Sequence, residues 1–311
     1  TISGANGVDD ITGGSGPDTL SGGSGDDIFR IKEGNDIITD LFTGDSFIVS
    51  SGATLHAKDI KNFVATNQTA NTGLARLTSS SVGSYIDMSN SATGSYTMEG
   101  SDQIDTLIGS SYNDIISGGA NSDIITGGLG NDIIDGGAGS DTVSYKNASG
   151  AVTVDLRVVT EQNTMSAGRD TIVYVENLAG SLHNDTLNGD NNHNVLSGYN
   201  GNDWIEGYLG NDFIDGGDGV DTVSYLSAPS AVSVDLSVAV SQATSGAGND
   251  TIKNIEDLRG SAYNDTLTGS SLDNTIGGFS GDDVIEGGLG NDILDGGAGT
   301  DTLNARYSVT A

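Results

Sequence analysis

A nine-residue unit rich in glycine and aspartate recurs along most of the chain and constrains its fold more than any other feature. Cut at glycine, one stretch reads GSDQIDTLI, GSSYNDIIS, GGANSDIIT, GGLGNDIID and GGAGSDTVS, from Gly100 to Ser144. The sixth residue of each unit is Asp, and the eighth is a large aliphatic residue. Similar arrays run over 180–224 and 260–304, and a shorter one over 4–39. One such unit cannot bury an apolar face alone, so the repeat predicts a stack of coils.

The physical properties of the unit suggest how the coils are built. Glycines at positions 1 to 6 favour tight turns because glycine reaches backbone conformations with φ > 0. Positions 7 to 9 form a short β segment whose middle side chain, such as that of Ile134, points inward. Two consecutive units turn the chain on opposite sides and make one coil of 18 residues. Asp123 should therefore stack over Asp141, and Asp114 over Asp132. The sequence predicts an all-β solenoid of parallel strands.

A longer period divides the chain into copies. The arrays repeat every 80 residues, and the connectors between them share AVTVDL with AVSVDL. Residues 40–99 follow neither period and are expected to form an irregular β-rich insert or linker, as an irregular solenoid or as a small inserted domain. The expected organisation is a short array at 1–39, the insert at 40–99, arrays with connectors at 100–179 and 180–259, and a truncated third copy at 260–311. The chain is therefore expected to be part of a larger polypeptide.

The composition of the chain argues against several classes of partner and of site. Acidic residues number 43 against 11 basic ones, which gives a net charge of −32 at pH 7. Such a charge disfavours nucleic acids and anionic membranes as partners, and it opposes compaction unless cations bind. No apolar run approaches the roughly 18 residues of a membrane span. The sequence contains no Cys, so disulfides and thiolate metal sites are excluded.

Stacked carboxylates indicate a site for a hard divalent cation. Carboxylates a few Å apart repel each other strongly, and a cation between them removes that repulsion. Ca²⁺ accepts about six to eight oxygens, backbone carbonyls included, whereas Mg²⁺ prefers a smaller octahedron. Two glycine turns and two aspartates can supply such an oxygen cage. The presence of only three His and no Cys argues against Zn²⁺ and Cu²⁺.

The pattern G-G-x-G-x-D-x-U-x, in which U is a large aliphatic residue, resembles the RTX (repeats-in-toxin) family of calcium-binding nonapeptide repeats. The resemblance implies a right-handed parallel β-roll. It also implies that each Ca²⁺ takes the position-6 carboxylates of two stacked loops, the carbonyls at positions 1 and 3 of the first, and those at positions 2 and 4 of the second. By roughly this rule the chain would hold about ten ions.

Carried onto this chain residue by residue, the resemblance implies the following ligand sets. They are Gly4, Asn6 and Asp9 with Gly23, Gly25 and Asp27; Gly13, Ser15 and Asp18 with Lys32, Gly34 and Asp36; Gly109, Ser111 and Asp114 with Gly128, Gly130 and Asp132; Gly118, Ala120 and Asp123 with Gly137, Gly139 and Asp141; Gly198, Asn200 and Asp203 with Gly217, Gly219 and Asp221; Gly278, Ser280 and Asp283 with Gly297, Gly299 and Asp301. Further ligands are Tyr208, Gly210 and Asp212; Gly288, Gly290 and Asp292; and Asp105, Asp185 and Asp265.

Some loops depart from the pattern, and most of these open the long arrays. Position 4 is not glycine in the first two loops of each array, where bulky residues such as Tyr112 and Leu272 resist φ > 0. Asn194 and Asn274 replace the position-6 aspartate, which lowers the ligand charge. The sequence therefore predicts graded sites that are tight at the C-terminal end of each array and weak or empty at its start.

The function expected from these features is that of a non-catalytic module. The chain carries no G-x-S-x-G elbow, H-E-x-x-H, P-loop or dinucleotide fingerprint. The resemblance implies calcium-dependent folding in a protein that leaves the cell by type I secretion, and the 80-residue superrepeat is similar to that of a bacterial adhesin or surface protein. The resemblance therefore also implies an extracellular or cell-surface location. Two alternatives stay open: an accessory module of an exoenzyme (lipase, protease or polysaccharide epimerase), and a solenoid face that contacts carbohydrate through Trp204 and Tyr208.

Overall fold

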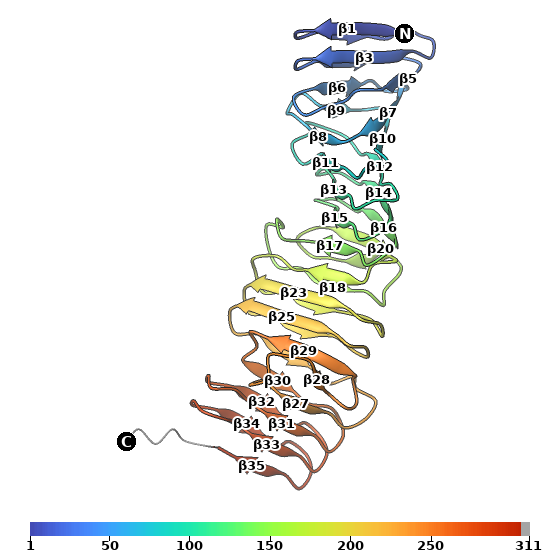
Figure 1. Ribbon diagram of the computed structural model, residues 1–311. Coiled ribbons are helices and arrows are strands. Elements are labelled where there is room, and N and C mark those ends of the chain that lie inside the picture. Colours follow the sequence, from blue (N-terminus) through green and yellow to red (C-terminus); the bar gives the residue numbers. More distant parts are fainter. Residues whose placement is uncertain (306–311) are drawn as a thin grey trace. The chain divides into compact units, whose positions relative to one another are not determined.

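The computed structural model describes residues 1–305, which form two compact units. The first unit comprises Thr1–Ser144 and Val158–Val175, and the second comprises Tyr145–Arg157 and the described residues from Glu176 onward. Within each unit, short strands stack as successive rungs (Figure 1). The structure places no helix in the part of the chain that it describes, and it contains no helical segment long and apolar enough to cross a membrane there.

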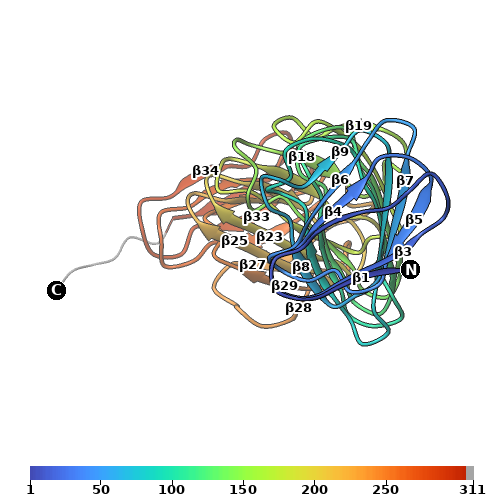
Figure 2. The same ribbon diagram turned by 90° about the horizontal axis from the view of Figure 1, so that it is seen from above.

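The first unit consists of three rows of strands. One sheet runs β1 (Ile2–Asn6), β3 (Thr19–Ser24), β5 (Asn35–Ile38), β7 (Thr54–Ile60), β10 (Leu74–Ser79), β12 (Thr97–Glu99), β14 (Ile115–Ala120), β16 (Ile133–Ala138), β20 (Arg169–Val173) and β19 (Gln162–Asn163). A second row runs β8 (Asn62–Val64), β11 (Tyr85–Asp87), β13 (Thr106–Ile108), β15 (Ile124–Thr126) and β17 (Thr142–Ser144). A third consists of β2 (Asp10–Thr12), β4 (Ile28–Ile31), β6 (Ser46–Val49) and β9 (Ala70–Asn71). Seen from above, β3 and β5 lie on one side of the first coils, and β4 and β6 on another (Figure 2).

The second unit repeats this arrangement. One row runs β21 (Asn177–Ala179), β23 (Val195–Asn200), β25 (Phe213–Asp218), β29 (Asn249–Lys253) and β28 (Gln242–Ala243). A sheet runs β18 (Thr153–Asp155), β22 (Thr186–Asn188), β24 (Trp204–Glu206), β26 (Thr222–Ser224), β30 (Asp257–Arg259), β32 (Thr275–Gly277) and β34 (Ile293–Asp295). The last consists of β27 (Ser233–Asp235), β31 (Thr266–Thr268), β33 (Val284–Glu286) and β35 (Thr302–Asn304).

The strand register confirms the 18-residue coil. In β14 and β16, Ile116 pairs with Ile134 in parallel, and Gly119 pairs with Gly137. The position-8 side chains point inward, and Ile125 and Ile134 are fully buried. Because the β segments are only a few residues long, each rung contributes little apolar area, and the core stays thin. The protein is an all-β parallel solenoid, as the repeat predicts.

Residues 40–99 continue the sheets of the first unit with longer coils. Thr54 of β7 pairs with Leu74 of β10, and Arg76 of β10 pairs with Thr97 of β12. The register shifts between Leu77 and Ser79, as in a β-bulge. The segment is therefore β-rich and irregular, and its strands belong to the solenoid's own sheets.

Each connector makes a longer excursion before its strand rejoins the stack. In the first unit, β20 pairs in parallel with β16 and carries the antiparallel partner β19. In the second unit, β29 pairs with β25 and carries β28 in the same way. Asp132 and Asp170 thus become neighbours although they are 38 residues apart in sequence.

Candidate metal sites: ladders of buried carboxylates

Hydrogen bonds join the position-6 aspartates of successive coils into ladders. The backbone N–H of Asp114 donates to Oδ1 of Asp132 at 2.8 Å. The sites expected from the sequence make the same contact, which joins Asp9 to Asp27, Asp18 to Asp36, Asp105 to Asp123, Asp123 to Asp141, Asp185 to Asp203, Asp203 to Asp221, Asp265 to Asp283 and Asp283 to Asp301. One carboxylate oxygen of each later residue is therefore fixed by the coil before it.

The second oxygen of many of these carboxylates is buried without a protein partner. Asp123 and Asp132 are each 1% exposed, yet their Oδ2 atoms accept no hydrogen bond. Among the described residues, this state is shared by Oδ2 of Asp9, Asp27, Asp36, Asp203, Asp212, Asp221 and Asp283. Because nearly all buried polar atoms in proteins have a partner, this set marks positions that a ligand outside the chain can satisfy.

Burial also makes these carboxylates costly to ionise. It raises the pKa of Asp132 to about 8, and repulsion from Asp170 and Asp114 adds to the shift, while the N–H of Asp114 opposes it. Burial raises the pKa of Asp212 to about 8 and that of Asp203 to about 7, each with repulsion from neighbouring carboxylates. A cation between the carboxylates offsets both the desolvation and the repulsion.

Glycine at position 1 creates the space that holds the unpartnered oxygen. A Cβ added at Gly127 would lie 2.4 Å from Oδ2 of Asp132, and one added at Gly198 would lie 2.1 Å from Oδ2 of Asp203. Glycine at position 2 allows the loops themselves to stack closely. At Gly128, with φ of 107°, an added Cβ would lie 1.9 Å from the Ser110 carbonyl oxygen. The glycines thus bring carbonyls and carboxylates of successive coils together.

The donor set of the ladders fits Ca²⁺ and not a softer metal. Nowhere in residues 1–305 do three or more His, Cys, Asp or Glu side chains converge on a common metal position. A bound cation would be held by two carboxylates, and the remaining ligands would be backbone carbonyls or water. An all-oxygen set of this kind in flexible loops suits Ca²⁺. When bound, the ion supplies charge neutralisation and cross-links successive coils.

The expected ligand sets differ in how closely their loops stack and in how many of their oxygens already accept hydrogen bonds within the protein. Gly23 and Gly25, Gly137 and Gly139, Gly217 and Gly219, and Gly297 and Gly299 stack directly on backbone atoms of the preceding coil. The set with Lys32 fits poorly, because the Gly34 carbonyl accepts the Thr54 N–H at 3.0 Å. Asp18, Asp105, Asp114, Asp185 and Asp265 each already accept an N–H from position 2 of their own loop.

Four ladder members were not included among the ligands expected from the sequence. Asp45 accepts the Asp27 N–H, Asp170 that of Asp132, Asp250 that of Asp212, and Glu256 that of Asp221. The signal for Asp170 and Asp250 was present in GRDTIV and GNDTIK, which resemble the end of a nonapeptide. Asp45 stands 18 residues after Asp27 in GDSFIV, so the coil period also pointed to it. Glu256 occupies no position of the nonapeptide, although the first connector has Glu176 at the equivalent place.

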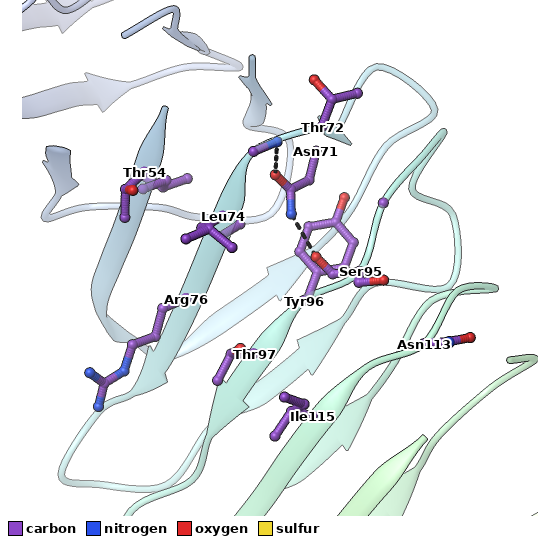
Figure 3. A pocket seen from close by; sticks show the side chains of 14 residues that line it. Thr54, Asn71, Thr72, Leu74, Arg76, Ser95, Tyr96, Thr97, Asn113 and Ile115 are labelled. Carbon is purple, nitrogen blue, oxygen red and sulfur yellow. Dashed lines mark hydrogen bonds between the residues drawn. The ribbon is translucent and has the colours of Figure 1, made fainter. Parts of the chain in front are cut away.

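A groove in the first unit has different chemistry. It measures ≈ 610 Å³ and lies along β10, β12 and β14, where Leu74 and Ile115 border it (Figure 3). Asn71 crosses one end, and its Nδ2 donates to the Ser95 carbonyl at 2.6 Å. Arg76 at the other end is paired with Glu99. No Asp, Glu or His lies on the described lining, so the groove offers neither a cation cage nor an acid–base pair.

A parallel solenoid whose loops stack buried carboxylates on glycine turns defines a class of metal-binding repeat protein. The model of the RTX calcium-binding nonapeptide repeat matches residues 3–38, 99–134, 108–143, 188–223, 254–278 and 277–306, together more than half of the chain. The chain belongs to this family and is a calcium-binding structural module. A search of curated proteins found no match to it.

Proposed function

We propose that the chain is a non-catalytic module that folds when it binds Ca²⁺, within a secreted bacterial protein. The observation that carries this proposal is the set of buried, unpartnered Oδ2 atoms, such as those of Asp203 and Asp221, stacked on successive coils. A chain that buries ionisable oxygens without partners loses stability. An ion that binds only the folded loops restores that stability.

The charge of the chain makes this dependence strong. At a net charge of −32, repulsion within the Ca²⁺-free chain opposes compaction, and the thin core offers little to offset it. Because the loops exist only in the folded state, the free energy of Ca²⁺ binding becomes free energy of folding. Extracellular calcium modules bind with dissociation constants of roughly 10⁻⁴–10⁻³ M, a range in which the chain would stay unfolded in the cytosol and fold outside.

This switch suits a chain exported through a narrow channel, as in type I secretion. The 80-residue superrepeat supports an adhesin-like or surface role, because such periodic arrays extend a protein by adding equivalent modules. We place the protein outside the cell or on its surface on these grounds.

Far-UV circular dichroism during a Ca²⁺ titration from zero to about 10 mM, a range that covers the expected affinities, tests the proposal. We expect a cooperative gain of β signal with Ca²⁺ and none with Mg²⁺, which serves as the control. An equal β signal with and without Ca²⁺ would mean that the core and the connectors hold the solenoid alone. The secretion-linked switch would then be wrong.

A second candidate function is carbohydrate binding by the second unit. A polar hollow of ≈ 350 Å³ is lined by Tyr199, Asp215, Asp218 and Asn254, among others. Asn254 donates to Asp215 at 2.7 Å, which fixes one wall. An aromatic ring beside carboxylates and amides is a combination that can stack on a sugar and hydrogen-bond its hydroxyls. A glycan array probed with the Ca²⁺-loaded protein tests this candidate, and uniformly blank spots would remove it.

A further inference from the structure

The nonapeptide loops adopt two backbone conformations that differ at position 2. In the open loops, position 2 is left-handed and Oδ2 of the position-6 Asp has no partner. These loops end in Asp9, Asp27, Asp123 and Asp132 in the first unit and in Asp203, Asp212, Asp221 and Asp283 in the second. Their position-4 residues are also left-handed, for example Gly130 with φ of 118° and Asn121 with φ of 70°. Asp36 also has an unpartnered Oδ2, but the position-2 residue of its loop, Lys32, is not left-handed.

In the closed loops of the long arrays that end in Asp, a serine at position 2 donates to the carboxylate, whereas in the short first array the N–H of Gly14 donates to Asp18 without a serine. The N–H of Ser110 donates to Oδ2 of Asp114 at 2.6 Å, and its Oγ donates to the same oxygen at 2.9 Å. The N–H of Tyr112, at position 4, donates to Oγ of Ser110 at 3.1 Å. Ser101 makes the same two contacts to Oδ2 of Asp105. Ser181 and Ser261 donate the N–H to Oδ2 and the Oγ to Oδ1 of Asp185 and Asp265.

Serine explains why bulky residues are accepted at position 4. In an open loop, position 4 must be left-handed, which favours glycine or asparagine. In a closed loop, position 4 instead donates its N–H to the serine Oγ in a local turn that needs no φ > 0. His183 and Tyr263 occupy position 4 of closed loops and donate to Ser181 and Ser261. The serine at position 2 and the side chain at position 4 therefore belong to one alternative loop structure.

The two loops with asparagine at position 6 are closed by the amide itself. Asn194 accepts the Asp190 N–H at 2.8 Å, and its Nδ2 donates to the Glu176 carbonyl at 2.7 Å. Asn274 accepts the Ser270 N–H at 2.7 Å, and its Nδ2 donates to the Glu256 carbonyl. An amide supplies its own N–H donors, so it satisfies an oxygen-rich position that a carboxylate leaves to a cation.

Hydroxyl groups also donate hydrogen bonds to the last carboxylate in two of the ladders. Thr164 donates to Oδ2 of Asp170 at 2.9 Å. Thr244 and Tyr225 both donate to Oδ2 of Asp250, at 3.1 and 2.9 Å. The open carboxylates Asp132 and Asp212 therefore lie between rungs whose side chains are already satisfied by the protein.

We infer that the serine at position 2 excludes Ca²⁺ from the first loops of each long array, and that these closed loops fold without metal as fixed rungs beside the calcium-requiring open loops. The inference rests on the proposed calcium-dependent folding and adds which loops take part in it. To bind an ion, Asp114 would have to lose both hydrogen bonds from Ser110 and gain a left-handed residue at positions 2 and 4. Each array would thus hold fewer ions than its number of stacked aspartate pairs suggests.

Hydrogen exchange of the wild-type protein compares a closed loop with the open loop stacked on it. Gly201 packs against the His183 carbonyl, so Gly180–Asp185 and Gly198–Asp203 share one environment and differ in loop type, and the next carboxylate, Asp221, is also open. We expect Ca²⁺ to slow exchange in Gly198–Asp203 by about tenfold or more, and that in Gly180–Asp185 by less than about threefold. Equal slowing in both loops would overturn the inference. No calcium effect in Gly198–Asp203 would overturn the proposed function, and the inference with it.

A gain-of-site variant tests the same inference in the opposite direction. Ser110→Gly with Tyr112→Gly removes the serine contacts and permits both left-handed residues. We expect equilibrium dialysis with metal analysis to find one additional Ca²⁺ per molecule. Tyr112→Gly alone is the matched control, and it should bind the wild-type number because Ser110 still holds Asp114. A wild-type number in the double variant would contradict the inference, and the wild-type exchange comparison decides the matter if that variant does not fold.

Discussion

Residues 40–99 and 100–144 build coils of the same sheets but are held together by different forces. In the first segment, Phe47 stacks on Phe63 with ring centroids 5.9 Å apart and meets Tyr96 edge-on at 6.0 Å. All three rings are buried. In the second segment, each β segment contributes one buried aliphatic side chain to the core, such as Ile116 or Ile125, and the loops stack carboxylates.

The difference teaches that parallel strand pairing alone does not decide what stabilises a solenoid. A buried aromatic ring removes about 150–250 Å² from water, so three rings in contact can hold longer, irregular coils. The nonapeptide coils have no such cluster and bury aspartates instead. The aromatic segment is therefore expected to be indifferent to Ca²⁺, and the nonapeptide coils are expected to depend on it.

Phe47→Ala should lower the stability of the protein more than any single substitution in the carboxylate ladders. Removing a buried aromatic side chain typically lowers the free energy of unfolding by about 3–5 kcal/mol. We expect this loss in denaturant unfolding, with hydrogen exchange accelerated in residues 40–99 both with and without Ca²⁺. Phe42→Ala is the control, since Phe42 is 48% exposed and should change little. A loss that appears only in Ca²⁺-free protein would contradict the comparison.

Gly127→Ala should act on the nonapeptide coils through the carboxylate alone. The added Cβ would lie 2.4 Å from Oδ2 of Asp132 and displace it, and Gly127 is not left-handed, so no backbone strain is added. Overpacking of this kind costs about 1–3 kcal/mol, and we expect a matching loss of stability in Ca²⁺, measured by thermal unfolding. Gly16→Ala is the matched control because a Cβ there meets nothing within 4 Å. Equal losses of stability from the two substitutions would show that the space that Gly127 leaves for Oδ2 of Asp132 has no special role.

Asp203→Asn should separate the role of the carboxylate as a Ca²⁺ ligand from its cost when it is buried without the ion. We expect the affinity of one Ca²⁺ site to fall by about tenfold, because ligand charge tunes calcium affinity. Without Ca²⁺, the variant should instead keep more β structure than the wild type, since no buried charge remains at this position. Isothermal titration and circular dichroism measure these two effects. Asp102→Asn, at an exposed side chain, should leave both unchanged. Loss of β signal without Ca²⁺ in the Asp203 variant would contradict the account.

The pH dependence of the Ca²⁺-free protein follows from the raised pKa values of the ladder. Between the ordinary value of 3.8 and about 8, folded Asp132 and Asp212 hold protons that the unfolded chain has released. Stability therefore falls as the pH rises through this window. We expect less β signal at pH 8 than at pH 5 in chelator, and tighter Ca²⁺ binding at pH 8 because the ion displaces protons. A Ca²⁺-free fold that strengthens as the pH rises would contradict the pKa shifts.

The periodic part of the molecule could be predicted closely from the sequence. The interval between Asp114 and Asp132 gave the coil length, and the position-8 residues gave the core, because both depend only on a repeated local structure. The pairing of Asp132 with Asp170 could not be predicted in the same way, since the connector interrupts the period. The closure of Asp114 by Ser110 depends on a side-chain hydrogen bond and a backbone φ that spacing does not encode. The aromatic cluster of Phe47, Phe63 and Tyr96 is likewise formed by residues of different coils.

Hydrogen exchange measured by mass spectrometry, with and without Ca²⁺, tests the central claim most directly. Within the first unit, the account predicts that β7 and β10 keep their protection in chelator, whereas the open loop Gly118–Asp123 loses about tenfold or more of its protection and regains it with Ca²⁺. Simultaneous loss in both segments, or protection of the open loop that ignores Ca²⁺, would contradict the claim that buried carboxylates make calcium part of this fold.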